Sequence, residues 1–388
     1  MICAAIIFSS LYLGVCFYLS RGLGKIIRQK NCEKFIENKA QRRVSVIVCA
    51  RNEEENIGKL LDCLLRQTYP KDKTQIIVAD DRSYDKTSEI ALSYKDKFDD
   101  FLLINIQNEQ TQTAPKKFAF TQAIRRAAGE IIVQTDADSV VSPDWIEKLI
   151  APFANDEISL VQGVVKYRFE KSAFFFLKTY QELDFLSHGI VAAAGIGKNI
   201  PLNANANNFA FRKETYDALG GYGTFDEAVG GDDGLLMQKV WQSGKKIFFN
   251  ADCAVGTKPE YSWKNLINQR KKWGSETRFY LPKQTAILVS IFAFYCFTIF
   301  AFIAIFINPR NLAFIPALLG IKIFGELLFM YEGLLLFGEK NLLFHIIWVS
   351  PINLFINAFS VFSGVFTKFD WKGDKFGAKV KRKRKENL

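Results

Sequence analysis

Two aspartates one residue apart, Asp136 and Asp138, follow the apolar run 131–133. Such a run predicts a buried strand, and open α/β folds bind ligands at the carboxyl ends of their strands. Because side chains alternate along an extended chain, both carboxylates would point the same way and could meet one cation. Hard oxygen ligands of this kind suit Mg²⁺ or Mn²⁺. An isolated Asp-x-Asp is more often a strand end followed by a turn, so the pair needs support from the rest of the chain.

Polar residues also follow two earlier apolar runs. Arg51 and Glu53 follow the first run, and Asp80 and Asp81 follow the second. Apolar, β-branched runs that alternate with helical segments predict a parallel sheet with right-handed crossovers. The polar strand ends would then meet at one edge of the sheet and form a site. The expected strands are 44–50, 75–79, 101–106 and 131–135, and the expected helices are 51–64, 85–97 and 117–128.

The alternation continues beyond Asp138. Ser142 and Pro143 are suitable as the N-cap and first residue of a helix. A further strand is expected at 159–165, and a long, largely apolar helix at 172–194. This helix carries His188, and a lone histidine on such a helix is more often structural than catalytic.

Two later helices carry polar groups with two possible uses. Asp232 and Asp233 begin a helix, where carboxylates are ordinary capping residues; beside a metal site they could also act as a base. A later helix carries Gln269, Arg270 and Trp273. It is either a basic amphipathic helix at a membrane surface or a phosphate-binding helix with a tryptophan face for a sugar ring.

The N-terminus is apolar. Residues 1–20 carry no charge, and Arg21, Lys25, Arg28 and Lys30 follow them. Twenty apolar residues can span a bilayer, and the basic residues place that end of the span in the cytoplasm. A signal peptide would begin with positive charge, which this segment lacks. We therefore expect a membrane anchor whose N-terminus lies outside.

Three apolar segments follow near the C-terminus, at 285–307, 312–337 and 342–366. The second contains Lys322 and Glu326, whose i,i+4 spacing lets them neutralise each other inside a bundle. Three spans would leave the basic end of the chain outside, against the positive-inside tendency. One of the last two segments could therefore be re-entrant or interfacial, and the sequence leaves this topology open.

Composition limits the class of protein. The 388 residues include 51 Lys or Arg against 40 Asp or Glu, a net charge of +11. Eight of the basic residues lie in 372–388. Next to an apolar segment such a tail is expected to meet anionic membrane lipids, and nothing else indicates nucleic-acid binding.

The seven cysteines form no Cys-x-x-Cys pair and no zinc spacing, which indicates reduced packing residues of a cytoplasm-facing protein.

In their order along the chain, these residues resemble the motifs of membrane-anchored family 2 glycosyltransferases. The resemblance covers about 44–275 and implies the GT-A fold. This is an α/β fold with a Rossmann-like, mostly parallel sheet flanked by helices, here with transmembrane helices at both termini. The matching segments are the first strand and its turn (46–53), Asp-Asp-x-Ser (80–83), a lysine element (115–119), Asp-x-Asp (136–138), an acceptor-side loop (205–212), Gly-Asp-Asp (231–233) and Gln-Arg-x-x-Trp (269–273).

The resemblance implies inverting transfer of a sugar from a nucleotide-sugar, with UDP-sugar expected, to a hydroxyl of a membrane-associated glycan or lipid-linked acceptor. It also implies Mg²⁺ or Mn²⁺ as cofactor. The implied catalytic residues are Asp233, as general base, and Asp232; the implied metal ligands are Asp136 and Asp138. The implied nucleotide-sugar contacts are Ala50, Arg51, Glu53, Asp80, Asp81, Lys116, Lys117, Asp136, Gln269 and Arg270, and the implied acceptor contacts are Asn207, Asn208 and Trp273.

Two departures from the family pattern bear on the type of transferase. Lys272 stands where processive enzymes usually carry Arg, which weakens bidentate phosphate recognition and favours a single transfer. Asp232 replaces the commoner Glu. A processive polysaccharide synthase and an inactive membrane scaffold of the same fold stay open as alternatives. A nucleotidyltransferase is disfavoured, because the turn at 50–54 has no glycine to hold phosphate.

We expect a multi-pass protein of the cell's inner (cytoplasmic) membrane with its catalytic domain in the cytoplasm. The expected parts are an N-terminal anchor (1–21), a basic linker (22–43), the GT-A domain (44–280), a membrane region of two or three segments (285–367) and a basic cytoplasmic tail (368–388).

Overall fold

The computed structural model describes residues 1–32, 42–107, 115–170, 174–222, 232–367, 369–371 and 374–376. Several predicted features fall outside these residues. They are residues 33–41 of the basic linker, Gly231, the side chain of Asp232 and the basic tail from 377 onward.

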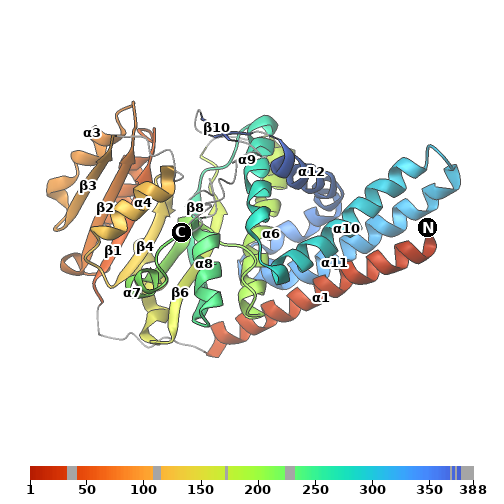
Figure 1. Ribbon diagram of the computed structural model, residues 1–388, viewed down its shortest axis with the longest axis horizontal. Helices are drawn as coiled ribbons and strands as arrows, with labels where there is room; N and C mark the ends of the chain where they lie inside the picture. The colour runs from red at the N-terminus through yellow and green to blue at the C-terminus, as the bar shows by residue number, and fades with distance from the viewer. Residues whose placement is uncertain are drawn as a thin grey trace, which may run out of the picture.

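A mixed sheet forms the centre of the polar part of the molecule (Figure 1). Among the described residues it has eight strands in the order β3-β2-β1-β4-β7-β6-β8-β5. The first four expected strands are parallel neighbours, as predicted, and β7 then pairs antiparallel with both β4 and β6. The strands are β1 (Val44–Ala50), β2 (Thr74–Asp81), β3 (Phe101–Ile106), β4 (Ile131–Asp136), β5 (Val140–Val141), β6 (Ile158–Tyr167), β7 (Phe209–Arg212) and β8 (Lys246–Thr257).

Helices cover both faces of this sheet. In β1, Val46 and Val48 pack on one face and Ile47 on the other, and all three are fully buried. Burial on both faces is why the strand reads as a continuous apolar run. The helices on the Val46 face are α2 (Ile57–Leu65), α3 (Thr87–Leu92) and α5 (Trp145–Ile150); those on the Ile47 face are α4 (Pro115–Arg125), α7 (Lys213–Ala218) and α8 (Asp232–Gln242).

Some predicted helix boundaries were wrong. Helix α2 begins at Ile57, so the acidic residues before it lie in a loop and not in its first turn. The helix expected at 85–97 ends at Leu92. Ser142 does not cap α5, because its hydroxyl donates to Asp144 Oδ1 (2.6 Å) and the helix begins only at Trp145.

A second, largely apolar body of helices adjoins the β6–β8 side of the sheet (Figure 1). Its core joins the N-terminal helix to α6, where Leu19, Leu23 and Ile26 lie with Ala192 and Ala193. Within the described part of the chain, four helical segments are long and apolar enough to cross a membrane: Ile2–Lys30, Pro282–Ala304, Pro309–Leu336 and Lys340–Phe366. The helices are α1 (Ile2–Cys32), α6 (Phe175–Gly197), α9 (Trp263–Glu276), α10 (Pro282–Ala304), α11 (Phe314–Leu336) and α12 (Ile346–Phe366).

The predicted ion pair between Lys322 and Glu326 is confirmed. Lys322 and Glu326 on α11 form an ion pair, and the Lys322 side chain is fully buried. Its ammonium also donates to Ser350 Oγ of α12 (3.1 Å) and lies over the Tyr295 ring of α10, 5.1 Å from the ring centre. These contacts compensate a buried charge that would otherwise be costly in an apolar bundle.

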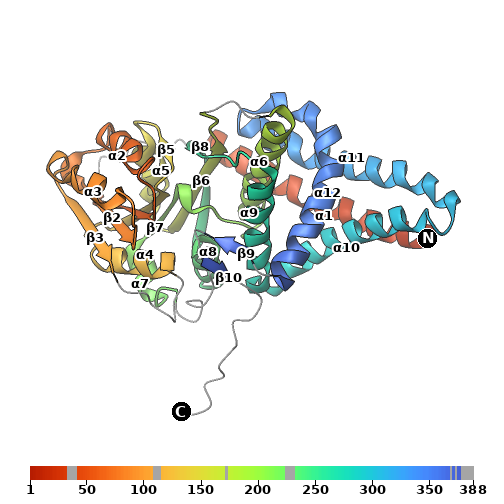
Figure 2. The ribbon, with the colours of Figure 1, turned by 90° about the horizontal axis from the view of Figure 1, so that it is seen from above.

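Helix α12 lies across the others. Helices α1, α10 and α11 extend together away from the sheet, whereas α12 runs across their long axes (Figures 1 and 2). Phe355, Phe359 and Phe362 of α12 are exposed, whereas Asn353 and Ser360 are buried. The helix therefore has an apolar outer face, and it turns polar side chains toward the other helices.

Helices α9 and α12 pack closely through two glycines. A Cβ atom at Gly274 of α9 would lie 2.5 Å from the Ser360 carbonyl oxygen of α12, and a Cβ at Gly364 would meet the Lys271 carbonyl. Arg278, just after α9, donates to the Gly364 carbonyl (3.2 Å). This contact fixes α12 against the helix that carries Arg270 and Trp273.

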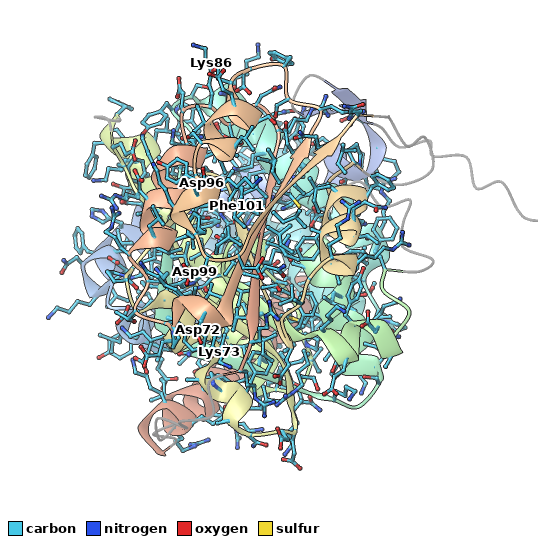
Figure 3. All side chains as sticks on the ribbon, turned by 90° about the vertical axis from the view of Figure 1, so that its left-hand side faces the viewer. Asp72, Lys73, Lys86, Asp96, Asp99 and Phe101 are labelled. Carbon is cyan, nitrogen blue, oxygen red and sulfur yellow. The ribbon has the colours of Figure 1, made fainter. Side chains whose placement is uncertain are left out.

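The end of the molecule farthest from the helical body is charged. Figure 3 shows this face with Asp72, Lys73, Lys86, Asp96 and Asp99, all of which are exposed. The charged end and the apolar helices thus lie on opposite sides of the molecule.

Candidate active site

A cavity of about 800 Å³ lies between the carboxyl edge of the sheet and the helical body. At the sheet end its wall includes Arg51, Asp136 and Asp138. At the other end the wall includes Tyr12 of α1 and Phe329 of α11. One cavity therefore connects the predicted polar site to the apolar helices.

The two aspartates of the Asp-x-Asp motif lie in this wall with different neighbours. Asp136 ends β4, and its Oδ1 accepts from Lys116 Nζ (2.8 Å) at the start of α4. Asp138 Oδ2 accepts from the Thr257 hydroxyl (3.1 Å) at the end of β8. Asn207 also donates to Thr257 (3.1 Å), which links the acceptor-side loop to Asp138. The sheet therefore brings Asp136, Asp138, Lys116 and Asn207 together, as the sequence predicts.

The donor set at this point fits a divalent cation shared with a ligand. Asp136 and Asp138 offer hard carboxylate oxygens at one strand end. Among the described residues, no three His, Cys, Asp or Glu side chains gather closely enough to hold a metal ion by themselves. Proteins commonly bind Mg²⁺ through one or two carboxylates plus substrate phosphates, and the two aspartates match that pattern.

Two loops at the sheet edge are tied together beside these aspartates. The Asn52 backbone amide donates to Ser83 Oγ (2.9 Å), and the Asn52 side chain accepts from the Tyr84 amide (3.1 Å). Asn52 has a positive φ of 54°, which turns the chain sharply after β1. Because of this turn, Ala50, Arg51 and Glu53 lie in the cavity wall, as predicted.

The two aspartates at the end of β2 have different roles. Asp80 is buried and accepts from the Ser83 amide (3.3 Å), and burial raises its pKa. Asp81 lines the cavity and pairs with Arg82 Nε (2.9 Å). Asp80 therefore shapes the loop, and Asp81 faces the space that a ligand would occupy.

Asp80 is therefore a predicted ligand contact that is buried outside the cavity wall, and two further predicted contacts also lie in the protein interior. Lys117 is 1 % exposed, with its Nζ 5.9 Å from the Tyr222 ring centre, and is not part of the cavity wall. Asn208 is fully buried: its amide donates to the Val164 and Cys253 carbonyls (2.8 and 2.9 Å) and accepts from Trp145 (3.0 Å). Neither side chain reaches the cavity, so both expectations are corrected here.

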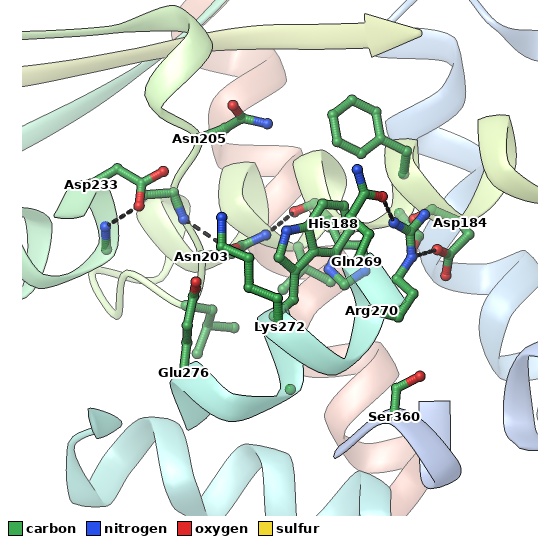
Figure 4. Close-up of a pocket in the computed structure, with 18 of the residues that line it drawn as sticks. Asp184, His188, Asn203, Asn205, Asp233, Gln269, Arg270, Lys272, Glu276 and Ser360 are labelled. Atoms are coloured by element: carbon green, nitrogen blue, oxygen red, sulfur yellow. Dashed lines mark hydrogen bonds and ion pairs between the residues drawn. The ribbon is translucent and has the colours of Figure 1, made fainter. Parts of the chain in front are cut away.

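Asp233 lies in the cavity wall near the N-terminus of α8. Its Oδ1 accepts from the Gly234 amide (2.7 Å) in the first turn of α8. Figure 4 shows Asp233 facing the same space as Asn203, Asn205 and Glu276. Asp233 therefore binds an amide of the first turn and also faces the cavity.

Arg270 is paired inside the protein. Its Nε donates to Asp184 Oδ2 of α6 (2.6 Å), and both side chains are nearly fully buried. The guanidinium also lies over the Trp273 ring at 4.1 Å, and a second nitrogen donates to Gln269. Burial disfavours its charge, but Asp184 raises its pKa above the usual range. Gln269, Arg270 and Trp273 all line the cavity, yet Arg270 is held by Asp184 and not by the Asp136 group.

His188 also belongs to this cluster. From the sequence it was expected to be a structural residue. Its ring meets Trp273 edge to face at 5.2 Å, and both rings line the cavity. Burial lowers the pKa of His188, so the ring is neutral near pH 7. The available signal was Asp184 and His188 at i,i+4 on a largely apolar helix, a spacing that places both on one face.

The mixed sheet, its carboxylate edge and the adjoining apolar helices define the class of the protein as a GT-A glycosyltransferase joined to membrane-type helices. Comparison with known families agrees. Residues 45–216 match the family model of Glycosyl transferase family 2, and 131–365 match that of Glycosyl transferase family group 2. The second match alone covers more than half of the chain. The chain therefore belongs to the family 2 glycosyltransferases, and the resemblance found in its motifs is confirmed.

Individual relatives are similar over shorter regions. The chain is 29 % identical over 287 residues to the probable glycosyltransferase YdaM of Bacillus subtilis, covering 71 % of this chain and 66 % of YdaM. It is 27 % identical over 182 residues to a beta-monoglucosyldiacylglycerol synthase of Nostoc sp., covering 46 % of this chain and 37 % of the synthase. The chain thus spans just under two thirds of the first relative and little more than a third of the second.

A solved structure is similar over nearly the whole chain. It is the mannosyltransferase PcManGT of Pyrobaculum calidifontis in complex with GDP-Man and Mn²⁺, with a TM-score of 0.52 and 18 % identity. The match covers 90 % of this chain and 99 % of that chain. This similarity confirms the predicted GT-A fold.

Proposed function

We propose that this protein transfers one sugar, with inversion, from a nucleotide-sugar to a hydroxyl of a membrane-associated acceptor. The observation that carries the proposal is one cavity whose wall holds Asp136, Asp138 and Asp233 and continues between membrane-type helices. The names of the relatives support it, since one is a probable glycosyltransferase and another a glycolipid synthase.

The donor would lie at the sheet edge. Arg51, Glu53 and Asp81 line the part of the cavity where the nucleoside would bind, and Asp136 and Asp138 lie where its diphosphate would be. They would hold Mg²⁺ or Mn²⁺ there, which supplies charge stabilisation to the leaving diphosphate. Lys116, already paired with Asp136, would add positive charge at the same place.

The acceptor would approach from the opposite side. Asp233 would accept the proton of the attacking hydroxyl as general base. Asn207 would help to orient the site through Thr257 and Asp138, and Trp273 offers an aromatic face in the same wall. The connection of this space to the apolar helices favours a lipid-borne acceptor.

A donor panel tests the proposal. Detergent-purified full-length protein is incubated with UDP-sugars and GDP-sugars, with Mg²⁺, Mn²⁺ or EDTA, and release of nucleoside diphosphate and donor binding are both measured. We expect metal-dependent release with one donor and none in EDTA. We expect release from a UDP-sugar. Release from a GDP-sugar instead would mean that the predicted nucleoside, uridine, is wrong. Donor binding without release would favour an inactive scaffold, and absence of both would contradict the proposal.

We also propose a topology for the membrane region. Helices α1, α10 and α11 would span the inner membrane, and α12 would lie at its cytoplasmic surface. The crossed position of α12 and its exposed phenylalanines support this arrangement. It places the catalytic domain and the basic C-terminal end in the cytoplasm with the N-terminus outside, in agreement with the positive-inside tendency.

The positions of the two chain ends test this topology. Because three spans reverse the side of the membrane and four restore it, we expect the ends on opposite sides. Alkaline phosphatase fused before Met1 should be active, and a fluorescent protein fused after Leu388 should fluoresce, since each reporter works on only one side. Both ends on the same side would mean that α12 spans the bilayer.

A further inference from the structure

Helices α6, α9 and α12 place a group of unsatisfied polar atoms in the cavity wall. Asp184 Oδ1, His188 Nε2, Arg270 Nη2 and Ser360 Oγ are buried and have no hydrogen-bond partner among the described residues. All four side chains line the cavity, and Asp184, Arg270 and Ser360 are at most 3 % exposed. Figure 4 shows Asp184, Arg270 and Gln269 next to one another, with His188 nearby and Ser360 below them on α12. Unsatisfied buried polar atoms are costly, and four in one wall indicate a ligand that supplies the missing partners.

The chemistry of this group indicates an uncharged, hydroxyl-bearing ligand. Asp184 neutralises Arg270, and His188 is neutral, so the cluster carries no net charge. Because Asp184 neutralises Arg270, the cluster has no spare positive charge for an anionic phosphate head group. A hydroxyl, by contrast, both donates and accepts, so it suits a carboxylate oxygen and a guanidinium nitrogen together.

The cavity continues from this cluster into an apolar passage. Its wall there includes Ile291 of α10, Met330 of α11 and Val349 of α12. Asn353 and Asn357 extend the polar inner face of α12 along the same passage. A ligand that fills both parts would have a polar head group and hydrocarbon chains.

We propose that the cluster of Asp184, His188, Arg270 and Ser360 is the head-group site for the acceptor, an uncharged polyol lipid with a sugar or glycerol head. The chains of this lipid lie between α10, α11 and α12, and its hydroxyl points toward Asp233. This assignment rests on the proposed function and specifies its acceptor as neutral, in contrast to a polyprenyl phosphate.

Photoaffinity labelling tests the site directly. The full-length protein, in phosphatidylcholine nanodiscs, is labelled with an alkyl β-glucoside that carries a diazirine in its chain. We expect labelled positions at Ile291 and Val349. Unlabelled dioleoylglycerol should compete, and undecaprenyl phosphate at the same concentration should not. Ser360→Leu fills the head-group space and should lower labelling at these positions by at least about tenfold, equivalent to about 1.4 kcal/mol of binding free energy.

The matched control is Ser290→Leu, the same substitution on α10 outside the cavity wall. This variant should be labelled to the same extent as the unsubstituted protein. Equal labelling of the two variants, or competition by undecaprenyl phosphate alone, would overturn the assignment. Donor binding is measured on the same preparations: if it is absent while labelling follows the expected pattern, the proposed transfer fails and the lipid site stands. If the donor binds but the cavity is not labelled, the proposed lipid site is wrong and the proposed transfer is not contradicted.

Discussion

Asp138→Ala is expected to lower kcat/KM for sugar transfer by about 10³-fold or more, which corresponds to about 4 kcal/mol of transition-state stabilisation. Asp138 lies in the cavity wall and is held by Thr257 at the end of β8, so its carboxylate is already positioned for a cation. Loss of one of two carboxylates should also weaken Mn²⁺ binding. Calorimetric titration of Mn²⁺ in the presence of nucleoside diphosphate measures this effect independently of turnover.

Thr257→Val is the graded control for this prediction. It removes the hydrogen bond to Asp138 but keeps the carboxylate, so we expect a loss of about tenfold, within the 10- to 100-fold typical of groups that orient metal ligands. If Asp138→Ala bound Mn²⁺ as tightly as the unsubstituted protein and kept its activity, the Asp-x-Asp motif would be only a strand end with a turn.

The parallel half of the sheet could be predicted because its strands are buried on both faces. Such burial requires continuous apolar runs, and these are visible in the sequence without any knowledge of the tertiary contacts. The same runs fix where each strand ends, so the polar residues at Arg51, Asp81 and Asp136 could be assigned to one edge. All three line the cavity.

Side-chain direction could not be predicted in the same way. Lys117 and Asn208 belong to the expected motifs by type, yet both point into the interior. Asn208 is satisfied by Trp145, Val164 and Cys253, which come from three separate parts of the chain. A motif records which residue types occur and how they are spaced, but partners this remote decide which side of the backbone a side chain occupies.

The role of Arg270 also depends on a partner that lies far away in the sequence. Its position in the Gln-Arg-x-x-Trp element predicts a phosphate contact, but Asp184 lies 86 residues earlier and pairs with it. Breaking a buried pair leaves an uncompensated charge, so Arg270 is held firmly in place. The polar stripe along α12 is visible in the sequence itself, since Ser350, Asn353, Asn357 and Ser360 follow one another at helical spacing.

Asp233→Asn is expected to lower kcat by about 10²- to 10⁴-fold, the range that a positioned general base contributes. The substitution keeps the size of the side chain and an oxygen that can accept from the Gly234 amide, so helix α8 should keep its first turn. The asparagine cannot take the proton of the acceptor hydroxyl. Donor affinity, measured by calorimetry with the nucleotide-sugar, should therefore stay near that of the unsubstituted protein while transfer is lost.

Asp217→Asn serves as the matched control, because Asp217 is an exposed carboxylate on α7 outside the cavity wall. It should leave transfer unchanged. If Asp233→Asn kept kcat within threefold of the unsubstituted protein, the proton would have to go to another carboxylate of the wall. Glu276 faces the same space in Figure 4, so Glu276→Gln would then be the informative variant. A loss of donor affinity in Asp233→Asn would instead mean that Asp233 helps to hold the nucleotide-sugar, and its assignment as base would fall.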